Sequence, residues 1–473
     1  MSCTTILAGR KATNDGSTMI SRTDDGFFDE KKIIVVQPHK QPKVYKTVNS
    51  HLSIELPANP LRYTSSPSIN TKNGVWPATG INEAHVGMTA TETITSNPRV
   101  LAADPLVVYD KESKKAGGIG EEDIVLLVLP YIRTAREGVL RLAELLEKYG
   151  TYESNGIAFN DEEEVWWLET IGGHHWIAQK LKDEEVVINP NQFGMDHFDL
   201  DDAFGAKNSN LCSADLKEFI KNNHLDLNND GIFNPRNIFG SHSDLDHIYN
   251  TPRAWYMGRC LCPFSYKWDG ENADFTPISD NIPWSFIPDR KVTVEDIAYI
   301  MSSHYQNTAY DPYSSQNTGK KGIYRSIGIN RTGITSICQL RKGLEPLEWV
   351  CFGSTTFSAF VPLYTNVNDM PAYFKNVTLD VSTENLYWSS RLLGALADGN
   401  YASSIAHIER YQQAIFIKGR EIVNRYDSVA DKDLEKANAE IAKMVKKETT
   451  AVLNKVLKDA SMHMKNGFNR ADN

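Results

Sequence analysis

A cysteine and several charged residues near the N-terminus have the types and spacing that nucleophilic chemistry requires. Cys3 opens one strand-like run, and Arg22, Asp24 and Asp25 end the next one. A guanidinium beside a thiol favours the thiolate, which is the nucleophilic form of cysteine. If the chain began at Cys3, its α-amino group, with an ordinary pKa of roughly 7.7–8.0, would be a base beside the thiol. A cysteine that is simply packed in the core is the alternative interpretation.

Two short runs of strand-forming residues must bring these groups together. Residues 4–7 and 18–23 flank an Asn-Asp-Gly turn signal, so they predict a β-hairpin. In such a hairpin, Arg22 and the carboxylates after it lie on the strand beside Cys3. The hairpin therefore places the guanidinium near the thiol despite their separation in the sequence.

The rest of the chain is predicted to form blocks of strands and blocks of helices. The pair Gly172-Gly173 predicts a tight two-residue hairpin, and apolar residues at three- and four-residue spacing predict two long antiparallel helices within 403–465. Without regular βαβ alternation, these blocks predict an α+β fold. The other predicted elements are helices that begin near residues 120, 134 and 293, and strands at 33–36, 44–48, 85–93, 334–340, 349–352 and 357–363.

Composition and charge exclude several classes of protein. The 473 residues carry a net charge of −10, so we do not expect a general polyanion binder, and nucleic acid is not a predicted partner. The longest uninterrupted apolar stretch, 124–130, is far shorter than the roughly 20 residues that a membrane span needs. Charged residues also interrupt the first thirty positions, where a secretory signal would lie. We therefore expect no membrane association and a cytoplasmic location.

No metal or other cofactor is predicted. The six cysteines contain no CxxC pair, which favours reduced thiols, and there is no HExxH motif. His174 and His175 are adjacent, so on a strand they would point to opposite faces and could not share one ion. The stretch from Asp226 to Gly231 imitates the start of a calcium loop, but position 237 is Asn where the loop needs a bidentate Glu.

The residues around Cys3 are similar to the opening of a known enzyme family. Cys3-Thr-Thr, the Asp15-Gly-Ser-Thr turn and Arg22-Thr-Asp-Asp together resemble the N-terminus of the thiol-dependent dipeptidase A family of bacteria. This family belongs to the N-terminal-nucleophile hydrolases and is related to penicillin V acylase and bile salt hydrolase. The resemblance continues, in order, through Gly80-Ile-Asn-Glu, Thr89-Ala-Thr-Glu-Thr, Glu164-Val-Trp-Trp-Leu-Glu-Thr, Gly173-His-His-Trp, Asn191-Gln-Phe, Thr251-Pro-Arg-Ala-Trp, His304-Tyr-Gln, Asp311-Pro-Tyr and Phe352-Gly-Ser-Thr.

The resemblance implies a four-layer αββα sandwich, with two antiparallel sheets between helical layers and the nucleophile at the start of a central strand. An amide hydrolase domain is expected over residues 1–400. Residues 401–473 are expected to form a helical segment that packs on the same domain or on a neighbouring subunit. A homo-oligomer is expected, because an exposed helical appendage needs a surface on which to bury its apolar stripe.

The resemblance also implies the roles of the charged residues around the nucleophile. Cys3 is the nucleophile, and Arg22 lies beside its thiolate. Asp25 matches the carboxylate that orients the free amine, with Asp24 as the alternative. Arg253 takes the place of a second arginine near the nucleophile.

Two asparagines are implied to form the oxyanion hole, which stabilises the tetrahedral intermediate. Asn82 matches the first of them. For the second, Asn191 fits the Asn-Gln-Phe block and is the predicted residue, and Asn189, which fits the acylase pattern about as well, is the alternative.

The implied activity is hydrolysis of dipeptides with broad specificity, through a thioester and without a metal. An N-acyl amide hydrolase of the same fold and a non-catalytic member are the alternatives. Met1 and Ser2 precede Cys3, so a free amine on Cys3 requires removal of both residues, by self-cleavage or otherwise. Ser2 as the nucleophile is the other possibility, although a hydroxyl is far less ionised than a thiol near neutral pH.

Overall fold

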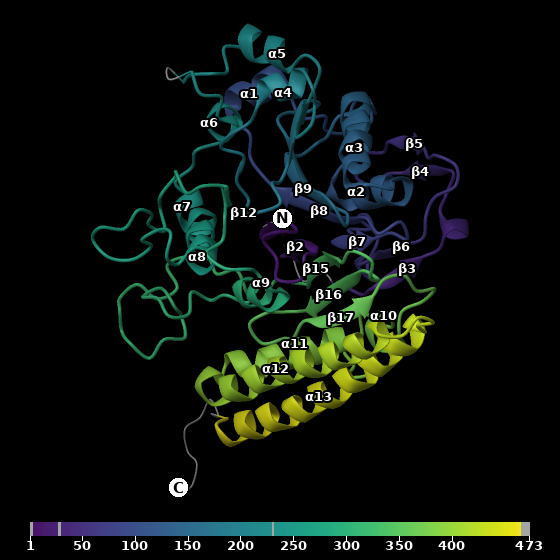
Figure 1. Cartoon of the computed structure of the whole chain (residues 1–473), viewed down its shortest axis with the longest axis vertical. Helices are drawn as coiled ribbons and strands as arrows, with labels where there is room; N and C mark the ends of the chain where they lie inside the picture. The colour runs from purple at the N-terminus through teal and green to yellow at the C-terminus, as the bar shows by residue number, and fades with distance from the viewer. Residues whose placement is uncertain (1–2, 27–29, 229–230, 465–473) are drawn as a thin grey trace.

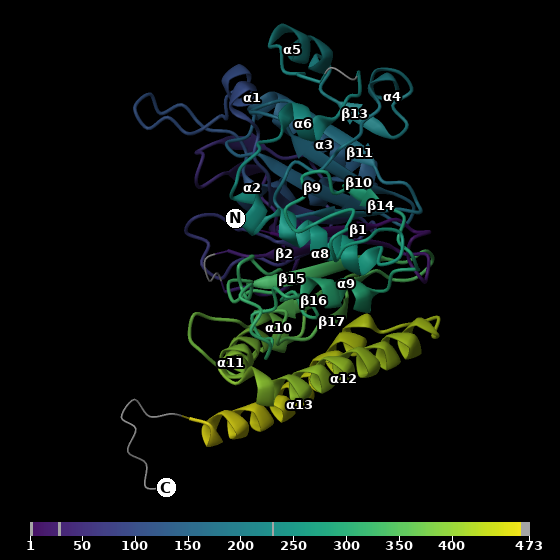
Figure 2. The ribbon, with the colours of Figure 1, turned by 90° about the vertical axis from the view of Figure 1, so that its left-hand side faces the viewer.

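The fold has four layers, in which two sheets lie face to face and helices cover the outer face of each (Figures 1 and 2). The computed structural model describes residues 3–26, 30–228 and 231–464. The α+β class and the layered arrangement predicted above are confirmed. Met1, Ser2 and Asp230 lie outside the described residues, so the predictions about the two-residue leader and the calcium-like loop stay predictions.

The first sheet contains the strand that follows Cys3. Strand β1 (Thr5–Ala8) pairs with β2 (Thr18–Asp24) in an antiparallel hairpin that places Thr5 opposite Arg22, which confirms the hairpin prediction. All neighbouring strands of this sheet are antiparallel. Its strand order is β14 (Ser285–Phe286), β12 (Val186–Asn189), β1, β2, β15 (Ile334–Leu340), β16 (Leu347–Phe352) and β17 (Val361–Tyr364).

The second sheet has six antiparallel strands, in the order β13 (Asn210–Cys212), β11 (Trp176–Lys180), β10 (Val165–Thr170), β9 (Asn155–Asn160), β8 (Gly87–Thr93) and β7 (Thr79–Ile81). Two small ribbons lie beside the main sheets. They pair β3 (Ile34–Val36) with β6 (Tyr63–Ser65), and β4 (Val44–Lys46) with β5 (Ser53–Glu55).

The connection between β10 and β11 differs from the prediction. The hairpin forms, but Thr170 lies opposite Trp176, so the connection is longer than the predicted two-residue turn. His174 and His175 lie in this connection, and their ring Nδ1 atoms both contact Asp104, at 3.1 and 2.7 Å. The expectation that the two rings point to opposite faces was therefore wrong, because the residues are in a turn and not on a strand.

Helices cover both outer faces. The helices α2 (Glu121–Val128) and α3 (Ala135–Tyr149) pack on the second sheet, while α11 (Leu386–Asp398), α12 (Tyr401–Asp427) and α13 (Leu434–Met462) pack on the first (Figure 1). The remaining helices are α1 (Pro98–Ala103), α4 (Leu200–Phe204), α5 (Leu216–Asn222), α6 (Pro235–Phe239), α7 (Asp246–Tyr249), α8 (Thr251–Leu261), α9 (Val294–Met301) and α10 (Ala372–Lys375), with 3₁₀ turns at Pro38–Lys40 and Leu129–Tyr131. In the described ranges, none of the helices is long and apolar enough to cross a bilayer.

The two long C-terminal helices run antiparallel, as the apolar spacing predicts. Tyr411 of α12 contacts Thr449 of α13 at 2.9 Å, while Tyr426 near the end of α12 donates to Glu440 near the start of α13. Their apolar side chains join the same hydrophobic cluster as strands β16 and β17. They therefore cover this sheet within the chain, while the division at residue 400 stays a prediction.

Apolar residues between the two sheets hold them together. Leu7, Ile20 and Val187 of the first sheet pack against Ala158 and Trp167 of the second, and all are buried. Burying a side chain of this size contributes roughly 1.5–3 kcal/mol, so this layer fixes the distance between the sheets. The polar residues discussed next lie near Cys3, where the two sheets also approach each other.

Candidate active site

Cys3 lies two residues before the start of β1, and its side chain is completely buried. Its Sγ accepts a hydrogen bond from Arg22 Nη2 at 3.0 Å. The guanidinium is held in place from the second sheet, since Arg22 Nε donates to the backbone oxygen of Thr91 in β8 at 2.9 Å. The thiol and the guanidinium are thus fixed by the pairing of β1 with β2 and by the approach of β8.

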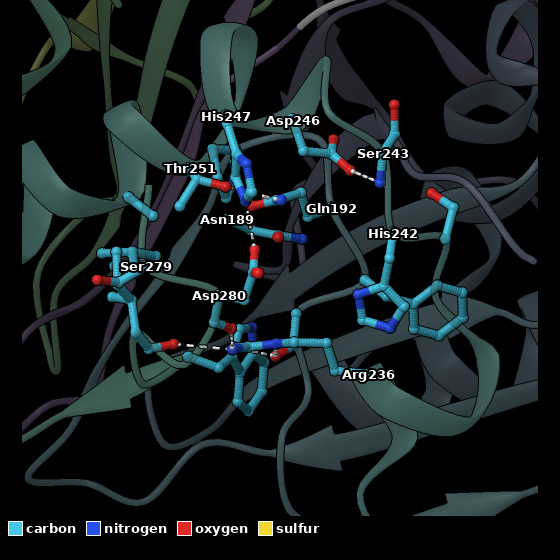
Figure 3. Close-up of a pocket in the computed structure, with 18 of the residues that line it drawn as sticks. Asn189, Gln192, Arg236, His242, Ser243, Asp246, His247, Thr251, Ser279 and Asp280 are labelled. Atoms are coloured by element: carbon cyan, nitrogen blue, oxygen red, sulfur yellow. Dashed lines mark hydrogen bonds and ion pairs between the residues drawn. The ribbon is translucent and has the colours of Figure 1, made fainter. Parts of the chain in front are cut away.

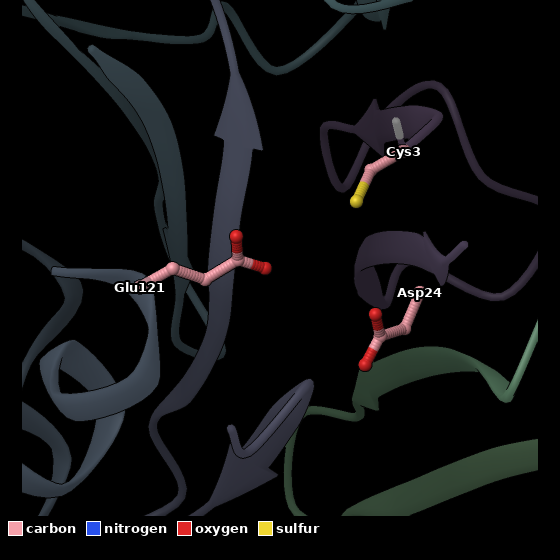
Figure 4. A group of neighbouring side chains, drawn as sticks. All are labelled: Cys3, Asp24 and Glu121. Atoms are coloured by element: carbon pink, nitrogen blue, oxygen red, sulfur yellow. The ribbon is translucent and has the colours of Figure 1, made fainter. Parts of the chain in front are cut away.

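Two carboxylates lie on the Sγ side of Cys3 (Figure 4). Glu121, the first residue of α2, forms a short ion pair with Arg22 Nη2. Asp24, near the end of β2, pairs with the ammonium of Lys31, with 2.7 Å between Oδ2 and Nζ. One ligand atom each from Cys3, Asp24 and Glu121 lie within 4.8 Å of one another. Charged groups of both signs therefore lie near the thiol of the candidate nucleophile, namely Arg22 and Lys31 with Asp24 and Glu121.

The position of Glu121 depends on the glycine before it. A Cβ at Gly120 would lie 2.2 Å from the hydroxyl oxygen of Tyr152, so only glycine lets this ring pack there. The backbone nitrogen of Glu121 donates to Glu153 Oε1 at 2.6 Å. An acidic residue at the first turn of a helix is also favoured by the helix dipole. These contacts fix the start of α2 against the site.

The backbone nitrogen of Cys3 contacts a different set of groups. It donates to Asn191 Oδ1 at 2.8 Å, and the same oxygen accepts from Arg253 Nη2 at 2.8 Å. Asn191 has a left-handed backbone, with φ of 63°, which asparagine tolerates better than most residues. Its own backbone nitrogen donates to Glu92 Oε1 at 2.8 Å, and its Nδ2 donates to the Thr93 oxygen at 3.0 Å. The thiol and the nitrogen of Cys3 are thus positioned by separate partners.

Arg253 connects helix α8 to this end of β1. Its Nη1 makes a short hydrogen bond to the backbone oxygen of Cys3 and donates to Thr4 Oγ1 at 2.7 Å. Glu92 of β8 completes the group, because its Oε2 accepts from Thr5 Oγ1 at 2.6 Å. The structure therefore brings together four of the six predicted site residues, namely Cys3, Arg22, Asn191 and Arg253.

The other two predicted residues, Asp25 and Asn82, have side-chain partners other than Cys3. Asp25 accepts from Arg325 Nη2 at 2.5 Å and from the hydroxyls of Thr332 and Thr23, and Thr23 Oγ1 in turn accepts from the Thr4 nitrogen. Asp25 therefore reaches β1 through another side chain. The predicted role of Asp25 in orienting the amine remains a prediction.

Asn82 lies in the turn between β7 and β8. Its Nδ2 donates to the backbone oxygens of Leu129 and Ile132, at 2.9 and 2.8 Å. Its Oδ1 accepts from the backbone nitrogens of Ala84 and Val86. The amide thus stabilises its own turn through Oδ1 and joins it to the 3₁₀ turn at Leu129–Tyr131 and the residue after it through Nδ2, and the oxyanion role of Asn82 remains a prediction.

Asn189, the alternative to Asn191, lies on the wall of a polar cavity of about 230 Å³ (Figure 3). Its side chain is buried, and neither polar atom has a hydrogen-bond partner among the described residues. His247 and Asp280 also line the cavity and contact each other at 2.8 Å. The lining residues include Gln192 but not Cys3, so this cavity is distinct from the group around the thiol.

Burial dominates the ionisation of the site. It raises the pKa of the Cys3 thiol well above its ordinary value; the charge of Arg22 opposes this shift and nearby carboxylates add to it. Burial also raises the pKa of Glu121 to about 7, although Arg22 opposes the shift. The pKa of Asp24 shifts in the opposite direction. Burial raises it, but the charges of Lys31 and Arg22 outweigh burial and lower it overall. The thiolate therefore needs further positive charge or a base.

Burial, together with the charge of the neighbouring Arg325, lowers the pKa of Arg253 to about 9. It raises the pKa of Glu92 to about 7, with Arg253 opposing the shift. A carboxyl with a raised pKa stabilises the fold below its unfolded pKa, near 4.5, and this contribution is lost as the pH rises through 7.

We expect Glu92→Gln to remove this pH dependence, because an amide does not titrate. Relative to the wild type, the variant should gain up to roughly 3 kcal/mol of unfolding free energy between about pH 5 and about pH 8. Urea unfolding of both proteins at the two pH values measures this difference. A constant hydrogen-bond penalty in the variant cancels in the comparison. Stability curves that stay parallel would show that Glu92 does not titrate in this range.

The cluster of Cys3, Asp24 and Glu121 is the group among the described residues whose atoms could hold a metal ion. The guanidinium of Arg22 and the ammonium of Lys31 already contact this cluster, so a divalent cation would meet two fixed positive charges. The expectation of a metal-free protein stays a prediction, which elemental analysis of the purified protein checks.

Comparison with known proteins shows the family. Residues 2–414 match peptidase family C69, so the chain belongs to this family of peptide hydrolases. Within it, the chain is 46% identical to a dipeptidase of Bifidobacterium longum (strain NCC 2705), with all of both chains covered. It is 49% identical to a probable dipeptidase A of Streptococcus pyogenes serotype M18 (strain MGAS8232), over 100% of this chain and 98% of that one. Dipeptidase A of Lactobacillus helveticus is 43% identical, over 84% and 82%. The resemblance to the dipeptidase A family is thus confirmed.

Glu92, Glu121 and Lys31 are not among the site residues that the sequence predicts. Glu92 lies within one of the blocks that carry the family resemblance, and Glu121 opens a predicted helix. Carboxylates at such positions are usually exposed to solvent, and no local pattern indicates that these two are buried. The pairing of Glu121 with Arg22 joins residues 99 positions apart, which only the fold reveals.

Proposed function

We propose that this chain is a dipeptidase of broad specificity in which Cys3, once it is the first residue, supplies both the nucleophile and the base. The observation that carries the proposal is the separate positioning of the two groups of Cys3. Sγ lies 3.0 Å from Arg22 Nη2, and the nitrogen lies 2.8 Å from Asn191 Oδ1. The names of the relatives, all dipeptidases, support the substrate class.

The proposed reaction begins when the free amine of Cys3 takes the proton of the thiol. The thiolate then attacks the carbonyl carbon of the dipeptide, a C–S bond forms, and the oxygen becomes an oxyanion that fixed donors stabilise. The C–N bond breaks as the ammonium returns its proton to the leaving amine. The Cys3 amine then takes a proton from water as the water attacks the thioester carbon and a C–O bond forms. The C–S bond breaks, the sulfur takes back this proton, and the N-terminal amino acid is released. Arg22 favours the thiolate, because its charge lies against the sulfur.

The proposal requires that Met1 and Ser2 leave, so that the nitrogen of Cys3 becomes an amine. The Asn191 side chain would then hold this amine through the same oxygen that accepts from Arg253. A cytoplasmic homo-oligomer is part of the proposal. Exposed apolar side chains on the two outermost helices, Ile417 and Leu457, favour contact with a second copy.

Three measurements on the purified active protein test the proposal. We expect an intact mass that begins at Cys3, rapid release of both amino acids from a series of plain dipeptides, and loss of this activity after alkylation by iodoacetamide. A chelator such as EDTA is expected to leave the activity unchanged. Activity that survives alkylation or disappears with the chelator would contradict the cysteine mechanism. Hydrolysis of N-acyl substrates in place of dipeptides would identify an acylase.

A further inference from the structure

Two buried carboxylate oxygens next to Cys3 have no hydrogen-bond partner among the described residues. They are Glu121 Oε2 and Asp24 Oδ1, and each residue is only 2% exposed. In each carboxylate the other oxygen is paired, with Arg22 and with Lys31 respectively. Figure 4 shows the Glu121 carboxylate directed toward Cys3 and Asp24. A buried carboxylate oxygen without a donor costs free energy, so a donor that arrives with the substrate would stabilise both atoms.

Covalent geometry limits which part of a substrate can reach them. In an amino acid residue, the α-nitrogen lies about 2.5 Å from the carbonyl carbon, given bonds of roughly 1.46 and 1.52 Å and an angle near 111°. A carbonyl carbon about to be attacked lies roughly 3–3.5 Å from the nucleophile. One oxygen of each carboxylate lies within 4.8 Å of Sγ, so both carboxylates are within reach of the α-nitrogen of the residue that carries the scissile carbonyl.

The number of donors identifies the form of that nitrogen. Two buried carboxylate oxygens, on Asp24 and Glu121, lack a donor among the described residues. An ammonium has three N–H donors and a positive charge, so it can satisfy both free oxygens. An acylated nitrogen is neutral and has a single N–H, which would leave at least one buried carboxylate oxygen without a donor.

We propose that Asp24 and Glu121 form a subsite for the free α-ammonium of the substrate's N-terminal residue. This inference rests on the proposed function and deepens it, because it assigns the substrates to peptides and amides with an unblocked amino group. A bound ammonium also adds positive charge beside the Cys3 thiol and so favours the thiolate when substrate is present. N-acylated amides lack this charge and are excluded by the same two carboxylates.

The test compares two substrates that differ only at the α-position. Alanyl-alanine has the amino group, and propanoyl-alanine has hydrogen in its place. We expect the wild type to prefer alanyl-alanine by about 10²-fold or more in kcat/KM, since each charge-assisted hydrogen bond contributes roughly tenfold or more. If the wild type hydrolyses both equally well, the subsite is excluded. If it hydrolyses no dipeptide, the proposed function itself is wrong.

Variants then assign the preference to the two side chains. We expect Glu121→Gln and Asp24→Asn each to reduce the preference for the free amine by about tenfold, mainly through KM for alanyl-alanine. Because both substrates use the same thiol, an indirect effect on Cys3 through Arg22 cancels in the ratio. A preference that is unchanged in both variants would overturn the assignment.

The matched control is Glu122→Gln, one residue along the same helix. Glu122 is also buried, but it contacts Tyr152 and the Asn49 amide and not Arg22. This variant is expected to keep the wild-type preference.

Protection of Cys3 from alkylation tests the subsite in the wild type, without a variant. Alaninamide should slow the reaction with iodoacetamide, and N-acetylalaninamide should not; equal protection would contradict the subsite.

Discussion

Replacing Cys3 by alanine is expected to reduce kcat for dipeptide hydrolysis by on the order of 10⁴-fold or more, as for the loss of the nucleophile in comparable acyl-transfer enzymes. The physical reason is that no thioester can form without Sγ. The fold should persist, because Arg22 keeps its contacts with Glu121 and with the Thr91 backbone after the sulfur is gone. Initial rates on a dipeptide and a thermal melt of the same sample check both statements.

The control for this variant is Cys212→Ala. Cys212 lies in β13 at the edge of the second sheet and is half-buried, so its removal should leave the rate unchanged. A Cys3→Ala variant that keeps a tenth or more of the wild-type activity would exclude Cys3 as the nucleophile. If Ser2→Ala then abolished the activity, the hydroxyl of Ser2 would take that role.

The same variant also reports on maturation. In self-cleavage, Sγ would attack the carbonyl carbon of Ser2, the C–N bond to Cys3 would break as its nitrogen takes a proton, and water would release the leader from the resulting thioester. Cys3→Ala cannot take this path, so its intact mass should still include Ser2. An N-terminus at position 3 in this variant would show that another enzyme removes the leader.

The local parts of the fold were predictable because their signals are local. The Asn-Asp-Gly turn fixes the hairpin of β1 and β2, and this pairing alone sets Thr5 opposite Arg22. The long helices α12 and α13 follow from apolar residues at helical spacing. The β10–β11 connection was mispredicted for a local reason, since Gly172 and Gly173 permit a tight turn without requiring one.

The site was only partly predictable, because its partners come from distant segments. Arg22 is adjacent to Cys3 through the hairpin, but Glu121 reaches it from the start of α2 and Glu92 from β8. The family resemblance placed Asn191 and Arg253 near the nucleophile, where the structure also has them. It could not indicate that both ends of the Asn82 amide already have backbone partners, Oδ1 within its own turn and Nδ2 at Leu129 and Ile132.

The two candidate asparagines, Asn189 at the end of β12 and Asn191 two residues later, have different surroundings. Asn191 Oδ1 accepts from both the Cys3 nitrogen and Arg253 Nη2, whereas Asn189 faces the cavity of Figure 3 without a partner among the described residues. If Asn191 holds the amine that acts as the base, truncating it removes the group that orients the proton transfer. An amide at this position can also donate to the developing oxyanion.

We therefore expect Asn191→Ala to lower kcat by about 10²–10³-fold, the loss that one missing donor causes in comparable acyl-transfer sites. Asn189→Ala is the matched control, two residues earlier, and should keep kcat within a few-fold of the wild type because the Asn189 side chain makes no hydrogen bond to Cys3 or Arg253. The pH profile of kcat separates positioning of the amine from a purely structural effect. Loss of the oxygen that holds the Cys3 amine should displace the limb of the profile that reports the base, while a structural defect lowers the whole curve. The reverse pattern, with Asn189→Ala inactive and Asn191→Ala fully active, would transfer the role to Asn189.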